Sequence, residues 1–312
     1  MIILYITVCC LNERGNANFV VMTFNTWVSG TNVVNGTMKI VSHIKRINPD
    51  VVALQEVYNS QFMAEILSCL GIQWSGALKK DESYPDTAIL TRHQLSKEPI
   101  HQLSHGLGTR IYIPKLQRNV SIWNLHLDYR SYGPYAAFNK LVTKKSQIRA
   151  GELLAGGRFE NIRELLSNTH FYDDVKNADA QPVIVCGDFN SPSHLDWTNE
   201  TKSIHGDWEF TWPATKILQT LMIDSYRQVH PDVIKHPGIT WSTVEKMSSA
   251  GWQWSIPEPQ DRIDFIFYRG QSLKPVNSYA YQGKKVVHRK PYHKYNDYPS
   301  DHFAVITVFE LK

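Results

Sequence analysis

Cysteine, net charge and long apolar runs are all scarce in this chain of 312 residues. Its four cysteines include no Cys-x-x-Cys pair, which argues against a structural zinc site and against a disulfide framework. No stretch reaches the roughly 20 apolar residues that a transmembrane helix needs. The net charge of +4 suits an anionic substrate but does not by itself predict a nucleic-acid-binding protein. With 42% hydrophobic residues, the composition is that of a globular, enzyme-sized chain.

The beginning of the chain differs from the rest. Residues 1–11 are nearly all apolar, which resembles a short secretory signal without its basic start, although an added edge strand or a gene-model artefact fits equally well. We therefore predict a signal-like or disordered segment over residues 1–17. The sequons at Asn35, Asn119 and Asn199 favour a secreted or luminal protein slightly over a cytoplasmic one.

Segments with helical and strand spacing alternate along the remaining residues. Residues 38–47 and 61–70 have helical spacing, and a longer, glycine-interrupted helical region covers 135–166. This alternation predicts a layered α/β fold, and the absence of any repeat, linker or boundary predicts one domain over 18–312. The expected strands are residues 19–24, 51–54, 87–90, 110–113, 120–127, 182–186, 263–268 and 303–309.

Polar side chains stand at the ends of these apolar strands, where solubility does not explain them. In α/β sheets, ligand-binding and catalytic groups gather at strand ends, where loops open a crevice. One acidic residue there is usually a turn or a helix cap, but five such places are hard to explain in that way. They predict a functional site formed by Glu56, by His126 with Asp128, by Asp188 with Asn190, by Asp264, and by Asp301 with His302.

The residue types limit the chemistry of that site. Glu56, Asp301, Asn25 and Asp188 offer hard oxygen donors, which suit Mg²⁺ or Mn²⁺ better than zinc. In an extended segment, Asp188 and Asn190 point to the same side. The carboxylate could then orient and deprotonate a water molecule, while the amide holds the water or the leaving oxygen.

Two histidines stand out by their placement. His302 could donate to negative charge that develops on phosphorus. A carboxylate such as Asp264 would hold its tautomer and raise its pKa. His126 lies at the end of an apolar strand, where a polar core contact is the alternative reading. Together these residues predict a metal-dependent phosphoester hydrolase.

Six short segments, in the same order as in a known family, span nearly the whole chain. Any one of them alone would be weak, but six in order make a strong signal. They are residues 23–27, 49–56, 124–127, 187–190, 262–266 and 300–302. With them the chain resembles the endonuclease/exonuclease/phosphatase superfamily, which includes deoxyribonuclease I, exonuclease III-type repair enzymes, neutral sphingomyelinases and inositol polyphosphate 5-phosphatases. The resemblance implies a four-layer α-β-β-α sandwich, in which two packed mixed β-sheets are flanked by helices.

The resemblance also implies residue roles. Glu56 would be the principal metal ligand, and Asn25 and Asp301 would complete the metal and phosphate shell. A strand-end turn is the alternative reading for Asn25. The implied cofactor is Mg²⁺ or Mn²⁺.

For the reaction itself, the resemblance implies that Asp188 positions or activates the attacking water and that Asn190 contacts the phosphate. His302, paired with Asp264, would stabilise the pentacoordinate phosphorus. His126 would contact the phosphate or assist the leaving group.

The substrate is less well determined. Sphingomyelinases and deoxyribonuclease-like members both carry a histidine at the place of His126, whereas abasic-site repair members typically have a tyrosine. The extended signature of inositol 5-phosphatases is missing. Asp128, Tyr129 and Arg130 follow His126 and are expected to line the mouth of the site, although a solvated Arg130 is the simpler alternative.

A tryptophan-rich loop at residues 241–259 is the second candidate for substrate contacts. Exposed rings such as Trp254 could stack on bases or dip into a lipid interface. The alternative is that they pack under the loop as a small satellite core.

Three functions remain open. The first is a phosphodiesterase that acts on nucleic acid or a phospholipid headgroup. The second is a phosphomonoesterase that acts on an inositol phosphate or another soluble metabolite. The third is a non-catalytic binding protein, against which the intact set of polar residues argues. We expect a monomer in each case.

Overall fold

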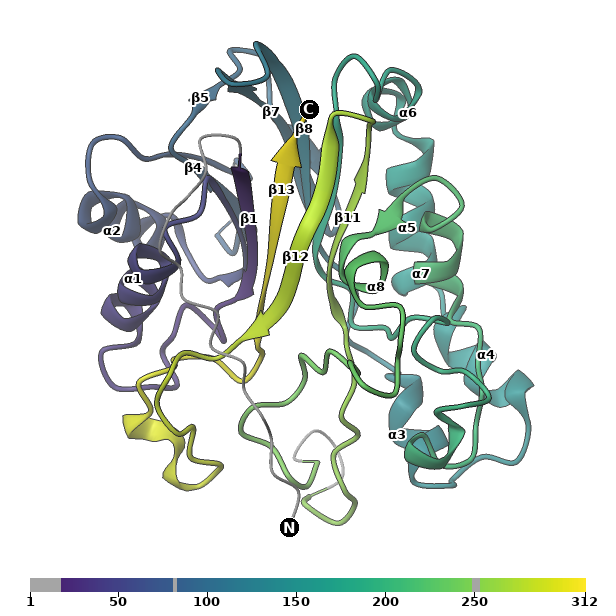
Figure 1. Cartoon of the computed structure of the whole chain (residues 1–312). Coiled ribbons are helices and arrows are strands. Elements are labelled where there is room, and N and C mark those ends of the chain that lie inside the picture. The colour runs from purple at the N-terminus through teal and green to yellow at the C-terminus, as the bar shows by residue number, and fades with distance from the viewer. Residues whose placement is uncertain (1–17, 81–82, 249–252) are drawn as a thin grey trace.

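Two mixed β-sheets lie face to face in the centre of the molecule, and helices cover both outer faces (Figure 1). The computed structural model describes residues 18–312 except 81–82 and 249–252. The segment predicted to be signal-like or disordered, residues 1–17, lies outside the described residues, and the domain boundary drawn there stays a prediction.

The first sheet has the strand order β12-β13-β1-β2-β4-β3. Only β1 and β2 run parallel, and the other neighbours in this sheet are antiparallel. The strands are β1 (Asn18–Asn25), β2 (Val51–Val57), β3 (Ser75–Leu78), β4 (Asp86–Thr91), β12 (Leu273–Tyr281) and β13 (Ala304–Leu311).

The second sheet has the order β10-β11-β9-β8-β7-β5, with β6 paired to β7. It repeats the same plan, because only β8 and β9 are parallel. The strands are β5 (Gln94–Leu95), β6 (His101–Leu103), β7 (Gly106–Ile113), β8 (Arg118–His126), β9 (Val183–Asp188), β10 (Ile223–Asp224) and β11 (Asp264–Arg269).

Helices α1 (Gly36–Ile47) and α2 (Ser60–Leu70) cover the first sheet, whereas α5 (Arg158–Ser167), α6 (Thr169–Lys176) and α7 (Pro213–Leu218) cover the second (Figure 1). No helix among the described residues has the length and apolar character needed to cross a bilayer. The shorter helices are α3 (Gly133–Phe138), α4 (Lys145–Glu152), α8 (Ser225–Val229), η1 (Lys202–Ile204) and η2 (Tyr292–Tyr295).

Strand alternation explains the layers. In β1, Phe19 and Val21 point into the core between the sheets, whereas Val20, Met22 and Phe24 pack against α1 and α2. A strand buried on both faces reads as a continuous apolar run, and this is the pattern of residues 19–24. The predicted four-layer sandwich is confirmed.

Several elements differ from the sequence prediction, which also missed short strands such as β3 and the helices α6, α7 and α8. The helical region expected over 135–166 is divided into α3, α4 and α5, and the glycines at 156 and 157 precede the third helix. Strand β12 was missed because Pro275 interrupts its pattern. The strand lies at the edge of its sheet, where proline is tolerated, and its pairing with β13 is irregular at that residue.

Candidate active site

The two parallel strand pairs end at the same edge of the sandwich, at the bottom of Figure 1. Asn25 is the last residue of β1, and Glu56 lies next to the end of β2. His126 ends β8 and Asp188 ends β9, and the two residues are paired in register. Asp264 opens the antiparallel strand β11 directly opposite Asp188. Residues from distant parts of the sequence therefore meet at one edge.

A buried polar bridge joins the two sheets just beneath this edge. The Gln55 side chain on β2 donates to Asn124 Oδ1 on β8 at 2.7 Å. Asn124 Nδ2 in turn donates to the backbone oxygens of Leu54 and Ala88 at 2.7 and 2.8 Å. Because these groups satisfy one another in the core, they fix the relative position of the sheet ends.

Glu56 reaches the site through a local break in strand geometry. Its φ is 59°, and the pairing of β2 with β4 shifts between Leu54 and Val57. A bulge of this kind redirects a side chain that regular alternation would send to the other face. The carboxylate accepts the Val28 backbone N–H at 2.6 Å and the Asn25 amide at 3.0 Å. Glu56 is thus held in place although it is only half-buried.

The carboxylate of Asp188 is the centre of the site. Asn25 Nδ2 donates to its Oδ2 at 3.0 Å. The Nε2 atoms of His126 and His302 each lie 3.6 Å from the same oxygen, on side chains that come from opposite sheets. Three nitrogen groups therefore converge on one buried carboxylate oxygen.

Gly187 and Asn190 position that carboxylate. Gly187 has a φ of 141°, and a Cβ there would lie 1.9 Å from the backbone oxygen of Leu125. Only glycine allows β8 and β9 to approach so closely. The Asn190 backbone N–H donates to Asp188 Oδ1 at 2.8 Å, and its side chain donates to Leu127 O at 2.9 Å. The contact of Asn190 with phosphate stays a prediction.

Asp264 and His302 form a buried pair. His302 Nδ1 lies 3.0 Å from Asp264 Oδ2, and the Asp264 backbone N–H donates to Thr240 Oγ1 at 3.1 Å. Burial lowers the pKa of His302, but the Asp264 and Asp188 carboxylates outweigh it and raise that pKa to about 10. The Trp241 ring covers the imidazole at a centroid distance of 4.7 Å. The two carboxylates therefore favour the protonated form of the shielded His302 imidazole.

A second pair, Asp86 with His126, was not predicted. His126 Nδ1 lies 2.9 Å from Asp86 Oδ1. Burial opposes protonation of His126, but the Asp86 carboxylate raises the pKa of the imidazole to about 10. Sequence reasoning selected polar residues after, within and just before apolar strands, but it overlooked Asp86 at the start of β4. The sequence did contain a comparable case, because Asp264, which was predicted, also lies at the start of its strand.

The carboxylates fit a divalent cation. Asp301 is buried, and its Oδ1 has no hydrogen-bond partner among the described residues. Burial raises the pKa of Asp301 well above its usual range, and the charge of Glu56 adds to this effect. A cation held by Asp301 and Glu56 would offset both the cost of burying a carboxylate charge and the repulsion between the two carboxylates. The donor set is all oxygen, which agrees with Mg²⁺ or Mn²⁺.

A different group also has metal-binding geometry. Asp188, Asp264 and His302 bring one donor atom each within 4.8 Å of one another. However, His302 Nδ1 and Asp264 are already hydrogen-bonded to each other. That Glu56 and Asp301 hold the cation stays a prediction.

Asn25 is oriented by its neighbours. Its Oδ1 accepts the Trp27 backbone N–H at 2.9 Å, so its Nδ2 faces Glu56 and Asp188. In this orientation the side chain aligns two carboxylates, and its role as a metal ligand stays a prediction.

The segment after His126 forms one rim of the site. Tyr129 is exposed, and Arg130 is half-exposed and paired with buried Asp128 at 2.8 Å. The buried guanidinium of Arg158 donates to the backbone oxygens of residues 128, 130 and 131 and pairs with Glu152. This rim is therefore rigid, and its contact with substrate stays a prediction.

The tryptophans of the loop at 241–259 have different environments. Trp241 packs on His302 and donates to Glu258 at 2.6 Å, so it belongs to the wall of the site. Trp254 is 50% exposed, which leaves its ring accessible to a ligand. Trp252 lies outside the described residues.

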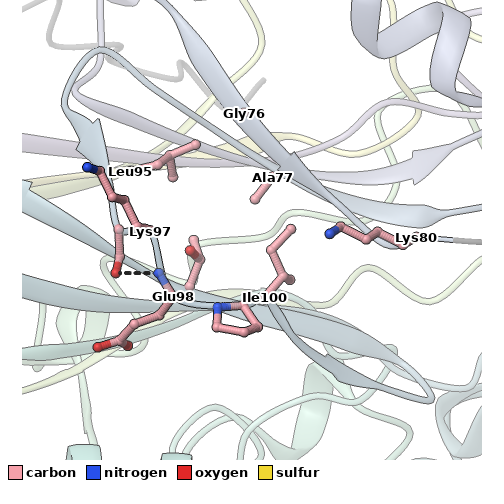
Figure 2. Close-up of a pocket in the computed structure, with 10 residues that line it drawn as sticks. Gly76, Ala77, Lys80, Leu95, Lys97, Glu98 and Ile100 are labelled. Atoms are coloured by element: carbon pink, nitrogen blue, oxygen red, sulfur yellow. Dashed lines mark hydrogen bonds between the residues drawn. The ribbon is translucent and has the colours of Figure 1, made fainter.

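Two cavities lie away from this cluster. Figure 2 shows the first, of about 340 Å³, between Ala77 of β3 and Leu95 of β5, with Lys80, Lys97 and Glu98 around it. The second, of about 540 Å³, is lined by residues of α4 and of the segments at 194–199 and 209–211. Neither lining contains a residue of the histidine and carboxylate cluster.

The sequence matches the Endonuclease/Exonuclease/phosphatase family over residues 22–302. The chain belongs to this family. Its members are hydrolases of phosphoester bonds and typically depend on a divalent metal. A protein of Caenorhabditis elegans, uncharacterized protein F14F9.5, is 48% identical over 289 residues, which are 92% of this chain and 90% of that protein.

Solved structures of other family members have the same fold. The human Nocturnin catalytic domain with bound sulfate anion superposes with a TM-score of 0.59 at 17% identity, covering 95% of this chain and 94% of that chain. D. rerio TDP2 complexed with single strand DNA product gives a TM-score of 0.58 at 18% identity, covering 94% and 98%. At these identities the likeness concerns the fold alone.

Proposed function

We propose that this chain is a phosphodiesterase that depends on Mg²⁺ or Mn²⁺ and attacks phosphorus with a water molecule held by Asp188. The observation that carries the proposal is the convergence on Asp188 Oδ2 of two imidazoles, each with a raised pKa. A proton acceptor with proton donors beside it can supply general base and general acid catalysis to the hydrolysis of a phosphoester.

Each residue then has one task. Asp188 takes the proton of the attacking water, and the backbone of Asn190 fixes its orientation. His302 donates from Nε2 to a non-bridging phosphate oxygen, because Asp264 holds its Nδ1. His126 protonates the leaving oxygen. Glu56 and Asp301 would hold the divalent cation, which when bound offsets the negative charge on the phosphate oxygens.

His126, a second acid beside His302, can protonate a leaving alkoxide, which a phosphomonoester needs as much as a phosphodiester does. Similarity to Nocturnin and TDP2 is consistent with phosphoester substrates that include nucleic acid. The alternative is a phosphomonoesterase, which would show itself by preference for a terminal phosphate.

An assay of the purified chain with bis-p-nitrophenyl phosphate and p-nitrophenyl phosphate, with Mg²⁺ and with EDTA, tests the proposal. We expect the diester to be the better substrate, and EDTA to abolish turnover reversibly. Glu56→Gln should abolish turnover in a way that added Mg²⁺ does not restore. The surface variant Glu98→Gln should leave turnover unchanged. Turnover that survives both EDTA and Glu56→Gln would refute the metal-dependent mechanism, and faster hydrolysis of the monoester would favour the alternative.

We also propose a secreted or luminal location and a monomeric state. The sequon residues Asn35 and Asn199 are exposed, as glycosylation requires. A mass shift of the protein from its native cells on glycosidase treatment tests the location, and light scattering tests the monomer.

A further inference from the structure

One loop of this protein is rich in lysine and arginine, and two of its lysines, Lys285 and Lys290, pair with Asp297 and Glu245 outside it. Residues 283–295, here called the basic loop, connect β12 to β13 and contain no acidic residue. The chain has a net charge of +4, so it would carry −1 without the five cations of this loop. These are Lys284, Lys285, Arg289, Lys290 and Lys294, and all but Lys290 are exposed.

Aromatic rings stand between these cations. Tyr292 and Tyr295 begin and end the 3₁₀ helix η2, and they are 78% and 82% exposed. Residues three apart in a 3₁₀ helix eclipse each other, so both rings project from the same side. Neither ring belongs to a hydrophobic core, so packing does not explain why two large aromatic side chains are placed on one face.

The basic loop is held in a fixed shape. The Asn296 side chain makes two hydrogen bonds of 2.8 Å with the backbone of His288, which closes the loop at its base. Lys39 Nζ donates to Asn296 O at 2.6 Å, and the Val34 backbone N–H donates to Lys294 O at 2.8 Å. The basic loop is therefore preorganised, and binding of a ligand does not carry the entropic cost of ordering the loop.

The basic loop adjoins the candidate active site. The Lys290 ammonium lies over the Trp27 ring at 5.2 Å and over the exposed Trp254 ring at 5.7 Å. The backbone of Trp27 is bonded to Asn25 in the site. Asp301 and His302 follow the loop within a few residues. In Figure 1 the loop is the yellow segment below β1, next to the strand ends that form the site.

We propose that the basic loop binds a single-stranded nucleic acid, with bases on Tyr292 and Tyr295 and phosphates on Lys284, Arg289 and Lys294, and guides a phosphodiester into the site. This inference rests on the proposed function. Proteins bind single-stranded nucleic acids on surfaces where aromatic rings alternate with cations. The bases stack on the rings, and the anionic phosphodiester linkages contact the cations. An anionic membrane is a weaker fit, since Val286 is the only exposed aliphatic side chain of the loop.

Fluorescence anisotropy of labelled DNA and RNA strands of about 16 nucleotides, in EDTA, measures binding without turnover. We expect Tyr292→Ala with Tyr295→Ala to weaken binding at least about tenfold through lost stacking. Tyr172→Ala removes another exposed tyrosine ring, from α6 at the far end of the molecule, and should not change binding.

The charge is tested separately. Replacing Lys284, Arg289 and Lys294 by glutamine should reduce the slope of log K against log salt by about 2, because each phosphate contact on a single strand contributes about 0.7. The matched control removes the same charge at the opposite end, from Lys97, Lys115 and Lys274, and should keep the wild-type slope.

Binding that both sets of loop variants leave unchanged would overturn the inference, as would binding of phosphatidylserine vesicles through the loop without binding of either strand. The proposed function is tested separately from strand binding, by hydrolysis of bis-p-nitrophenyl phosphate. The tyrosine variants should hydrolyse this compound at the wild-type rate. A wild-type chain that hydrolyses this compound but binds no strand would refute only the role of the loop. A chain that binds strands but hydrolyses nothing would refute only the proposed function.

Discussion

Two histidine–aspartate pairs flank Asp188, and they differ in their access to solvent. In one, Asp264 of the second sheet holds His302, which lies just before β13. In the other, Asp86 of the first sheet holds His126 of the second. Both histidines place Nε2 3.6 Å from the same oxygen. The side chains of Asp264 and His302 are only 1% and 5% exposed, whereas those of Asp86 and His126 are 19% and 14% exposed.

The difference in burial assigns different work to similar groups. For Asp264, burial outweighs the charge of His302 and raises the pKa to about 6. For Asp86, burial also acts to raise the pKa, but the charge and hydrogen bond of His126 outweigh it and the pKa is lowered. A shielded imidazolium exerts its charge in a water-poor setting, where electrostatic stabilisation is strongest. The more exposed imidazolium can recover its proton from solvent, as an acid for the leaving group must do after each turnover.

His302→Ala should have the largest effect. Removal of the shielded donor is expected to lower kcat/KM by at least about 10³-fold. The loss should be the same for a p-nitrophenyl ester and an alkyl ester, because the non-bridging oxygen is common to both. Steady-state kinetics on the two substrates measure it, with circular dichroism as the folding control. Near-normal turnover would remove His302 from the mechanism.

His126→Ala should depend on the leaving group. With an alkyl diester we expect a loss of about 10²-fold, since the leaving alkoxide needs a proton. With bis-p-nitrophenyl phosphate the loss should fall below about tenfold, because p-nitrophenolate leaves without one. An equal loss on both substrates would show that the two histidines do the same work.

The two aspartates give a matched test of the same comparison. Asp264→Asn is expected to lower kcat/KM about 10²-fold, because the amide favours the wrong tautomer of a shielded imidazole. Asp86→Asn should cost about tenfold, since solvent can assist the more exposed His126. Parallel assays on an alkyl diester decide the order, and a reversed order would contradict the roles assigned from burial.

Arg158→Met should have the smallest effect on chemistry and a large one on stability. The variant leaves Glu152 buried without its partner, which costs about 3–5 kcal/mol of unfolding free energy. Because Arg158 fixes only the rim after His126, KM should rise more than kcat falls. Urea denaturation and kinetics at a temperature where the variant is folded measure both. A lower kcat at unchanged KM would place Arg158 in the support of the reacting groups.

The family resemblance predicted the sandwich. The convergence of Glu56, Asp188, Asp264 and His302 was predicted from polar residues that lie at the ends of apolar strands or within them. Sequence reasoning did not predict Asp86, because this carboxylate follows Pro85 in a polar stretch that has the composition of a loop. The orientation of the Asn25 amide depends on the Trp27 backbone, and the redirection of Glu56 depends on a bulge. Both are tertiary effects that no local pattern contains.

The basic loop shows a different limit. Averaged over the chain, its charge disappears into a small net value, and its tyrosines look like ordinary loop residues. Only the 3₁₀ turn and the closure by Asn296 bring the rings to one side and the loop beside the site.

The pairing of β1 with β13 has a consequence for biosynthesis. The strand that ends in Asn25 leaves the ribosome more than 270 residues before Asp301 and His302, which precede its neighbour β13. A nascent chain that stops before these residues lacks the proposed proton donor and one proposed cation ligand. Copies that end before His302 should therefore be inert towards phosphoesters in the cell.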